Sequence, residues 1–210
     1  MLWGGFEGGL EVRREGDGAV RLAGRFPYNK RAVLSDGGRA GRPRKEGFAS
    51  RAFAYRINKP DEDIHLLVGH DFNRPLASRA AGTLNVKDDD VAVTFTARIT
   101  PEMTEVSYVR DFLGTMGAGL VGGISPGFRI PPKRAVPNAE KVEDEGHDPA
   151  RGMHNAIIRT VMSALLYELS VVTRPAYPET QVEARSWETP PRGDNPGFPT
   201  TRFRGIARWR

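Results

Sequence analysis

The chain has 210 residues and a mass of 23.1 kDa, a length that suits one folded domain with at most a short appendage. Hydrophobic residues make up 39% of the sequence and charged residues 27%, which predicts a globular protein rather than a disordered one. The 24 glycines and 16 prolines exceed the average shares of about 7% and 5%, and this excess favours a strand-rich and loop-rich chain over a helical bundle.

Cysteine is absent, which excludes disulfide frameworks, thiolate metal sites and cysteine nucleophiles. No apolar run reaches the about 18 residues of a membrane span. Residues 1–10 lack the basic and apolar segments of a signal peptide. We therefore expect a cytoplasmic protein that does not enter a membrane, and we expect neither a metal nor another cofactor.

The net charge of +5 is unevenly distributed along the chain. Residues 186–210 carry five arginines against two acidic residues, so this segment holds +3 and the remainder only +2. Phe203 and Trp209 lie between arginines in this segment, a pattern compatible with phosphate contact and base stacking. Because the rest of the chain is nearly neutral, we do not expect nucleic acid as a partner. We expect a domain at residues 1–185 and a Pro- and Arg-rich tail at 186–210 that is disordered or processed.

The first predicted element is a β-hairpin whose strands, residues 10–14 and 19–26, flank the turn-forming sequence Gly16-Asp17-Gly18. The polar stretch 29–46 is predicted to be a long loop with short extended pieces, and long ordered loops are often functional. Residues 48–57 alternate as a strand does. The short apolar run at 64–68 predicts a buried strand.

A second hairpin is predicted at residues 81–86 and 91–99. A helix is predicted at 101–116, with Thr100 as its cap and Pro101 in its first turn. Its apolar stripe consists of Val106, Val109, Leu113 and Met116.

Residues 124–130 are predicted to be extended, and residues 131–151 show no pattern and are predicted to be a flexible excursion. The β-branched ends of the segment 155–172 favour strand over helix. The expected fold class is α+β and mostly β.

Three short clusters could carry chemistry. His70 follows the apolar run 64–68, where it can be oriented by a core and still reach solvent, as a general base must. An ordinary histidine at the edge of a core is the alternative.

The second cluster is Gly-Ile-Ser-Pro-Gly, residues 123–127, around Ser125. Its Gly-x-Ser-x-Gly form matches the nucleophile elbow of α/β-hydrolases, but that elbow needs a strand, a turn and then a helix. Here the helix is expected before the motif. A glycine-rich turn without chemistry is the alternative.

The third cluster surrounds Glu168, a carboxylate within an apolar segment. Burying such a group is costly unless it has a partner, and a histidine N–H would supply one. The alternative is an exposed carboxylate on the polar face of a strand.

The three clusters together, Leu-Leu-x-x-His-Asp, Gly-x-Ser-x-Gly-Phe and Glu-x-Ser-x-Val-Thr-x-Pro-Ala-x-Pro in this order, resemble the prohead maturation proteases of tailed bacteriophages. The resemblance extends from about Gly24 to Val182. It implies the fold of herpesvirus assemblins, an antiparallel β-barrel core with surrounding helices, and it implies a serine endopeptidase.

By their motifs, Ser125 matches the nucleophile, His70 the general base and Glu168 the third residue, which orients the base. These are the roles of a catalytic triad. Asp71 is an alternative orienting acid. However, adjacent strand residues point to opposite faces of a sheet, and this disfavours Asp71.

The donors that would stabilise the oxyanion are not readable from the motif alone. Pro126 has no N–H, so the amide directly after the nucleophile cannot serve. The candidates are Gly127, through its backbone amide, Arg129, through its guanidinium, or donors from another loop.

The resemblance also implies the partners. Such proteases act inside the immature capsid, in the host cytoplasm, and cleave the scaffolding protein or the N-terminal segment of the major capsid protein, and usually themselves. Assemblins are activated by dimerisation, so a homodimer is reasonable. The alternative function is a structural protein that binds capsid or scaffold without catalysis.

Overall fold

The computed structural model describes residues 10–39, 41–121 and 123–173. These residues belong to one compact unit that spans 1–179, and the predicted tail at 186–210 lies outside the described residues. The described strands form three four-stranded sheets and one two-stranded sheet.

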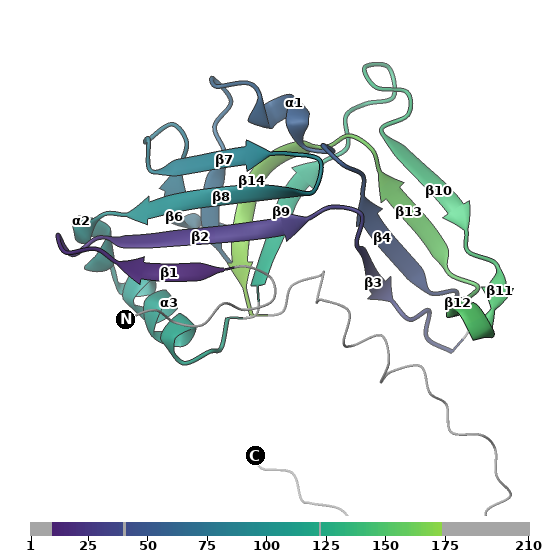
Figure 1. Cartoon of the computed structure of the whole chain (residues 1–210), viewed down its shortest axis with the longest axis horizontal. Coiled ribbons are helices and arrows are strands. Elements are labelled where there is room, and N and C mark those ends of the chain that lie inside the picture. Colours follow the sequence, from purple (N-terminus) through teal and green to yellow (C-terminus); the bar gives the residue numbers. More distant parts are fainter. Residues whose placement is uncertain (1–9, 40, 122, 174–210) are drawn as a thin grey trace, which may run out of the picture. The chain divides into compact units, whose positions relative to one another are not determined.

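The first sheet has the strand order β1-β2-β8-β7 and is antiparallel throughout. It consists of β1 (Glu11–Arg14), β2 (Val20–Pro27), β7 (Leu84–Asp88) and β8 (Ala92–Ile99). Burial alternates along β2 and for most of β8, so one face of each strand packs on the core. Both predicted hairpins are confirmed, and Figure 1 shows their strands running side by side.

The second sheet has the order β6-β5-β14-β9 and positions every predicted site residue. Its strands are β5 (His65–Val68), β6 (Asp71–Ser78), β9 (Gly123–Arg129) and β14 (Leu165–Val172). The central strand β14 is parallel to β5 and antiparallel to β9. The predicted strands at 64–68, 124–130 and 155–172 are confirmed, the last as β13 (Ile157–Val161) followed by β14.

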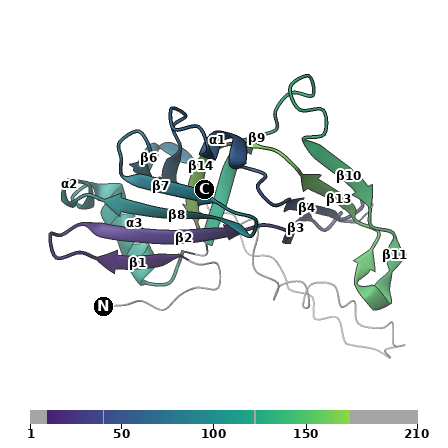
Figure 2. The ribbon, with the colours of Figure 1, turned by 45° about the horizontal axis from the view of Figure 1, so that its top comes forward.

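The third sheet has the order β10-β13-β4-β3 and includes β3 (Arg31–Ser35), β4 (Arg44–Phe48) and β10 (Glu140–Asp144). A short hairpin of β11 (His147–Asp148) and β12 (Met153–His154), with the 3-10 helix η1 (Pro149–Arg151), extends from it. Figures 1 and 2 show this hairpin at the end of the unit opposite α2 and α3.

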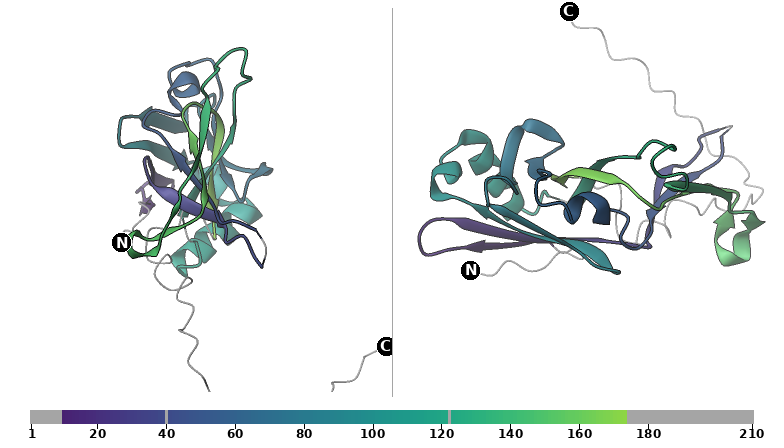
Figure 3. Two further views of the ribbon diagram at one scale, coloured as in Figure 1. Left: turned by 90° about the vertical axis from the view of Figure 1, so that its right-hand side faces the viewer. Right: turned by 90° about the horizontal axis from the view of Figure 1, so that it is seen from above.

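The helices are short: α1 (Ala54–Ile57), α2 (Pro101–Thr104) and α3 (Ser107–Gly117). The helix predicted at 101–116 is divided after Thr104. Pro101 lies in the first turn as predicted, but Thr100 occupies the cap position without a side-chain hydrogen bond to the backbone of the helix. The right-hand view of Figure 3 shows both pieces at one end of the strands.

An aromatic cluster joins the three large sheets. The ring centroids of Phe48 (β4) and Phe128 (β9) are 4.9 Å apart in an edge-to-face arrangement, and Phe26 (β2) lies 5.4 Å from Phe48. Phe53 fills the space between these rings and is fully buried. Aromatic side chains bury large areas, so this cluster contributes to the stability of the unit.

Two predictions about local structure are wrong: the predicted strand 48–57 ends at Phe48 and gives way to α1, and the predicted excursion 131–151 contains β10. The extended pieces predicted within the loop 29–46 are present as β3 and the start of β4, but they are paired strands of a sheet. All five residues of β10 are exposed. Hydropathy therefore gives no signal there, and pairing with β13 decides the structure.

The expected fold class, α+β and mostly β, is confirmed. Within the described residues no ladder closes a sheet into a barrel, so the barrel and the likeness to herpesvirus assemblins stay predictions. No helix in this part of the chain is long and apolar enough to cross a membrane.

Candidate active site

The site is built around β14, whose two neighbours bring distant residues together. Ser170 is the cross-strand partner of Ser125 in β9, and Glu168 is the partner of Gly127. Partners in a sheet point to the same face, with Cβ atoms about 5 Å apart. The predicted nucleophile and the predicted carboxylate therefore lie on one face of one sheet.

His70 reaches this face through a tight turn. Val68 in β5 pairs with Asp71 in β6, which leaves Gly69 and His70 as a two-residue hairpin loop. Both have positive φ, +64° and +61°, as a type I′ turn requires. Glycine adopts this conformation readily, whereas a side chain such as that of histidine makes it costly. The backbone at His70 is therefore held by its surroundings.

The ring of His70 is hydrogen bonded to Glu168, with 2.6 Å between Nδ1 and Oε1. The Ser170 hydroxyl donates to the other carboxylate oxygen of Glu168 at 2.7 Å, and the His70 amide donates to Ser170 Oγ at 2.9 Å. The Glu168 side chain is only 4% exposed, while that of His70 is 46% exposed. Hydrogen bonds thus hold the buried Glu168 carboxylate in place, while the His70 ring still faces solvent.

Gly127 leaves the space that the Glu168 carboxylate occupies. A Cβ atom at this position would lie 1.9 Å from Glu168 Oε1 and 2.6 Å from Cδ. The backbone fixes the position of such a Cβ atom, so it could not rotate away from the clash. The Glu168 carboxylate would have to move instead, away from its hydrogen bonds with His70 and Ser170. The glycine two residues after Ser125 is therefore required by the carboxylate across the strand.

Ser125 is nearly buried, with 9% of its surface exposed. It precedes Gly127, the cross-strand partner of Glu168, by two residues in β9. Within the described part of the chain, no hydrogen bond joins its hydroxyl to the His70 ring. Contacts between nucleophile and base are often long in unliganded sites and tighten when substrate binds. With Nδ1 bound to Glu168, the ring nitrogen left to accept a proton is Nε2.

The alternative acid, Asp71, is directed elsewhere. Its Oδ1 accepts hydrogen bonds from the backbone and side-chain nitrogens of Asn73 at 2.8 and 3.1 Å. Its Oδ2 lies 3.5 Å from Arg74 Nε. The carboxylate that contacts His70 is that of Glu168.

The two oxyanion candidates, Gly127 and Arg129, both lie in β9 but differ in where their donors are directed. Pro126 pairs with Leu169 and has no N–H, so it takes a non-hydrogen-bonded position and the amide of Gly127 points toward β14. The Arg129 guanidinium lies 5.5 Å from the centre of the Tyr167 ring. In the residues that the structure describes, this guanidinium has no ion pair, so it retains its hydrogen-bonding capacity.

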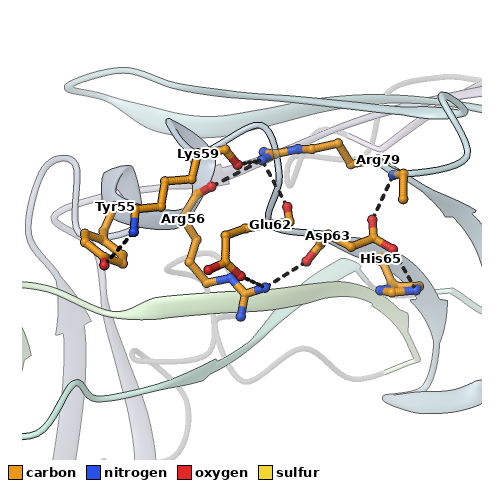
Figure 4. Close-up of polar contacts among 8 residues, drawn as sticks. Tyr55, Arg56, Lys59, Glu62, Asp63, His65 and Arg79 are labelled. Carbon is orange, nitrogen blue, oxygen red and sulfur yellow. Dashed lines mark hydrogen bonds and ion pairs between the residues drawn. The ribbon is translucent and has the colours of Figure 1, made fainter.

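A polar cluster holds the segment that leads into β5 (Figure 4). Arg56 of α1 forms an ion pair with Glu62 at 2.8 Å and donates to the carbonyl of Asp63 at 3.0 Å. Arg79 donates to the three carbonyls of Arg56, Lys59 and Glu62 at 2.9–3.3 Å. These contacts fix the start of the strand that ends at the His70 turn.

Sequence reasoning assigned no role to Ser170, although it contacts both Glu168 and His70. The available signal was its spacing, because a hydroxyl two residues from Glu168 in a strand shares its face. No group of histidine and acidic side chains in the described ranges could hold a metal ion.

A model of the caudovirus prohead serine protease family matches residues 34–192. No curated protein and no solved structure matches the chain. The matched segment is well over half of the chain and contains β5, β9 and β14, the strands that position the site. The chain therefore belongs to the caudovirus prohead serine protease family and is a serine protease.

Proposed function

We propose that Ser125, His70 and Glu168 are the catalytic triad of this protease. The observation that carries the proposal is the 2.6 Å hydrogen bond between His70 and Glu168 on the sheet face that also bears Ser125. A base oriented by a buried carboxylate beside a serine is the arrangement that activates a hydroxyl for attack on a carbonyl.

In this mechanism Ser125 Oγ attacks the scissile carbonyl carbon and His70 Nε2 takes its proton. Glu168 stays ionised and stabilises the imidazolium. As the tetrahedral intermediate collapses, His70 gives the proton to the leaving amine, and an acyl-enzyme on Ser125 remains. Water then attacks that ester with His70 again as the base, which releases the second product and restores the serine.

The oxyanion needs donors that are not committed to the sheet. Of the two candidates, the amide of Gly127 faces β14, whereas the Arg129 side chain is exposed and its guanidinium can turn. Stabilisation of the intermediate by Arg129 is therefore favoured over that by Gly127.

The family's description associates these serine proteases with the prohead of tailed phages. For this chain, the proposed substrates are the scaffolding protein or the N-terminal segment of the major capsid protein, and the protease itself, during prohead maturation in the host cytoplasm. A homodimer is part of the same proposal. Residues 186–210 would be a segment removed by self-cleavage, and an intact Arg210 on protease from mature particles would contradict this.

The test is co-expression of the full chain with the neighbouring capsid gene, followed by intact mass measurement of every product. Wild type is compared with Ser125→Ala, and Ser107→Ala serves as the matched control because Ser107 is exposed at the start of α3. Loss of a defined fragment from a capsid or scaffold protein with wild type and the control alone supports the proposal. Identical products with all three folded proteins would overturn it and favour a structural role.

A further inference from the structure

We propose that Ser170 is a positioning residue of this protease, which fixes both the orienting carboxylate and the turn that carries the general base. This inference rests on the proposed triad. Ser170 itself does not touch the reacting atoms; it acts through Glu168 and His70.

The Ser170 hydroxyl makes one hydrogen bond to each of two triad members, His70 and Glu168. Its only proton goes to Glu168 Oε2 at 2.7 Å, and its oxygen accepts the amide of His70 at 2.9 Å. A hydroxyl has one donor and two acceptor sites, so these two contacts use the donor and one acceptor site. Ser170 is completely buried, so water does not replace either contact.

Each contact restrains a different degree of freedom. The bond to Glu168 prevents the carboxylate from rotating about its terminal torsion, and its other oxygen then points at His70 Nδ1. The bond from the His70 amide fixes the turn at a residue with φ of +61°, a conformation that costs energy for any residue except glycine. One hydroxyl thus joins the two halves of the acid–base pair, which are 98 residues apart in the sequence.

The catalytic consequence follows from the charge that forms on His70. When the ring takes the serine proton, the imidazolium is stabilised only if the carboxylate stays in place. Loss of the hydroxyl removes a hydrogen bond to a charged group and is therefore expected to slow reaction at Ser125 about 10- to 100-fold.

The experiment compares full-length wild type, Ser170→Ala, Ser170→Thr and Val171→Ala. Val171 is buried on the same strand but faces away from the triad, so its truncation destabilises β14 without removing a contact to it. Three readouts are taken on folded protein: the rate at which a fluorophosphonate labels Ser125, the downfield NMR signal of the His70 ring N–H proton, and hydrogen exchange of the His70 amide.

Ser170→Ala is expected to label about 10- to 100-fold more slowly, to lose or shift the ring-proton signal and to exchange the His70 amide faster. Ser170→Thr, which keeps the hydroxyl, is expected to restore the ring-proton signal. Val171→Ala is expected to keep that signal, and its labelling rate and amide exchange rate should lie within about twofold of wild type. If Ser170→Ala matches Val171→Ala in the proton signal and in amide exchange, the inference is overturned.

The two proposals fail differently. A wild-type protein that does not react with the fluorophosphonate contradicts the proposed triad, while the proton signal and amide exchange still report on Ser170. A reactive wild type with an unaffected Ser170→Ala variant leaves the triad in place and removes the positioning role.

Discussion

Replacing Gly127 with alanine would place a methyl group within the carboxylate of Glu168. The new carbon would lie 1.9 Å from Oε1, which is 1.5 Å short of an ordinary contact of 3.4 Å. A shift of that size lengthens the 2.6 Å bond to His70 and the 2.7 Å bond from Ser170 beyond hydrogen-bonding range. The substitution thus separates the base from its orienting group without altering either side chain.

The magnitude follows from the two lost contacts. The buried hydrogen bond from Ser170 to the carboxylate is worth about 1.5–3 kcal/mol, whereas the one to His70 is worth only about 0.5–1 kcal/mol because its ring is half-exposed. We expect a loss of about 2–4 kcal/mol in the free energy of unfolding. At about 2–4 °C per kcal/mol for a chain of this size, the melting temperature falls by about 5–15 °C. Labelling of Ser125 by a fluorophosphonate is expected to slow at least ~100-fold, the lower end of what general base catalysis contributes.

Gly24→Ala provides the matched control. Its Cβ would lie 2.3 Å from a ring carbon of the buried Phe95, so it creates a comparable clash between neighbouring strands, but in the sheet that lacks the triad. It is expected to lower the melting temperature and to leave the labelling rate of the folded protein within about twofold of wild type. A Gly127→Ala protein that is folded and labels as fast as Gly24→Ala would refute the reasoning.

Two other substitutions test the structure away from the triad. Gly114→Ala in α3 places its methyl group in open space and removes a helix-interior glycine, so it should raise stability by about 0.5–1 kcal/mol; an unchanged or lower melting temperature contradicts this. Glu145→Gln removes the charge that lies 2.8 Å from Lys45. Burial raises the pKa of Glu145, but hydrogen bonds from Lys45 and two backbone amides outweigh it and bring the pKa below 4.5. Such a lowered pKa stabilises the fold above the unfolded value and loses this effect as the pH falls through the folded value. The difference in melting temperature between wild type and Glu145→Gln should therefore be present at pH 7 and shrink below about pH 4.5; a difference independent of pH would show that the charge is not responsible.

The sequence was most informative where residue type and chemistry coincide. His70, Ser125 and Glu168 follow from short motifs, and two of them, His70 and Glu168, are in direct contact in the structure. The turn-forming sequence Gly16-Asp17-Gly18 located the first hairpin, and alternating hydrophobicity located the second strand of the other hairpin, β8, where most of one face is buried. These are local patterns, and each can be read without knowing which strands are neighbours.

Contacts between distant segments could not be read in the same way. The segments that form β3 and β10 have little apolar alternation, and they are strands because β4 and β13 offer them free backbone groups. The same holds for the left-handed backbone of His70. Nothing within Val-Gly-His-Asp shows that a serine 100 residues later accepts its amide proton.

The face of the sheet on which each side chain of Ser-Pro-Gly at 125–127 lies depends on the register of β9 against β14. A shift by one residue would turn Ser125 to the opposite face of the sheet and away from Glu168. Pro126 opposes that shift, because it can pair only where no N–H is needed. Gly127 opposes it too, because only glycine fits across from the Glu168 carboxylate. The two residues that follow the serine thus hold it on the face where the base and its carboxylate lie, which explains this motif in an extended strand without a nucleophile elbow.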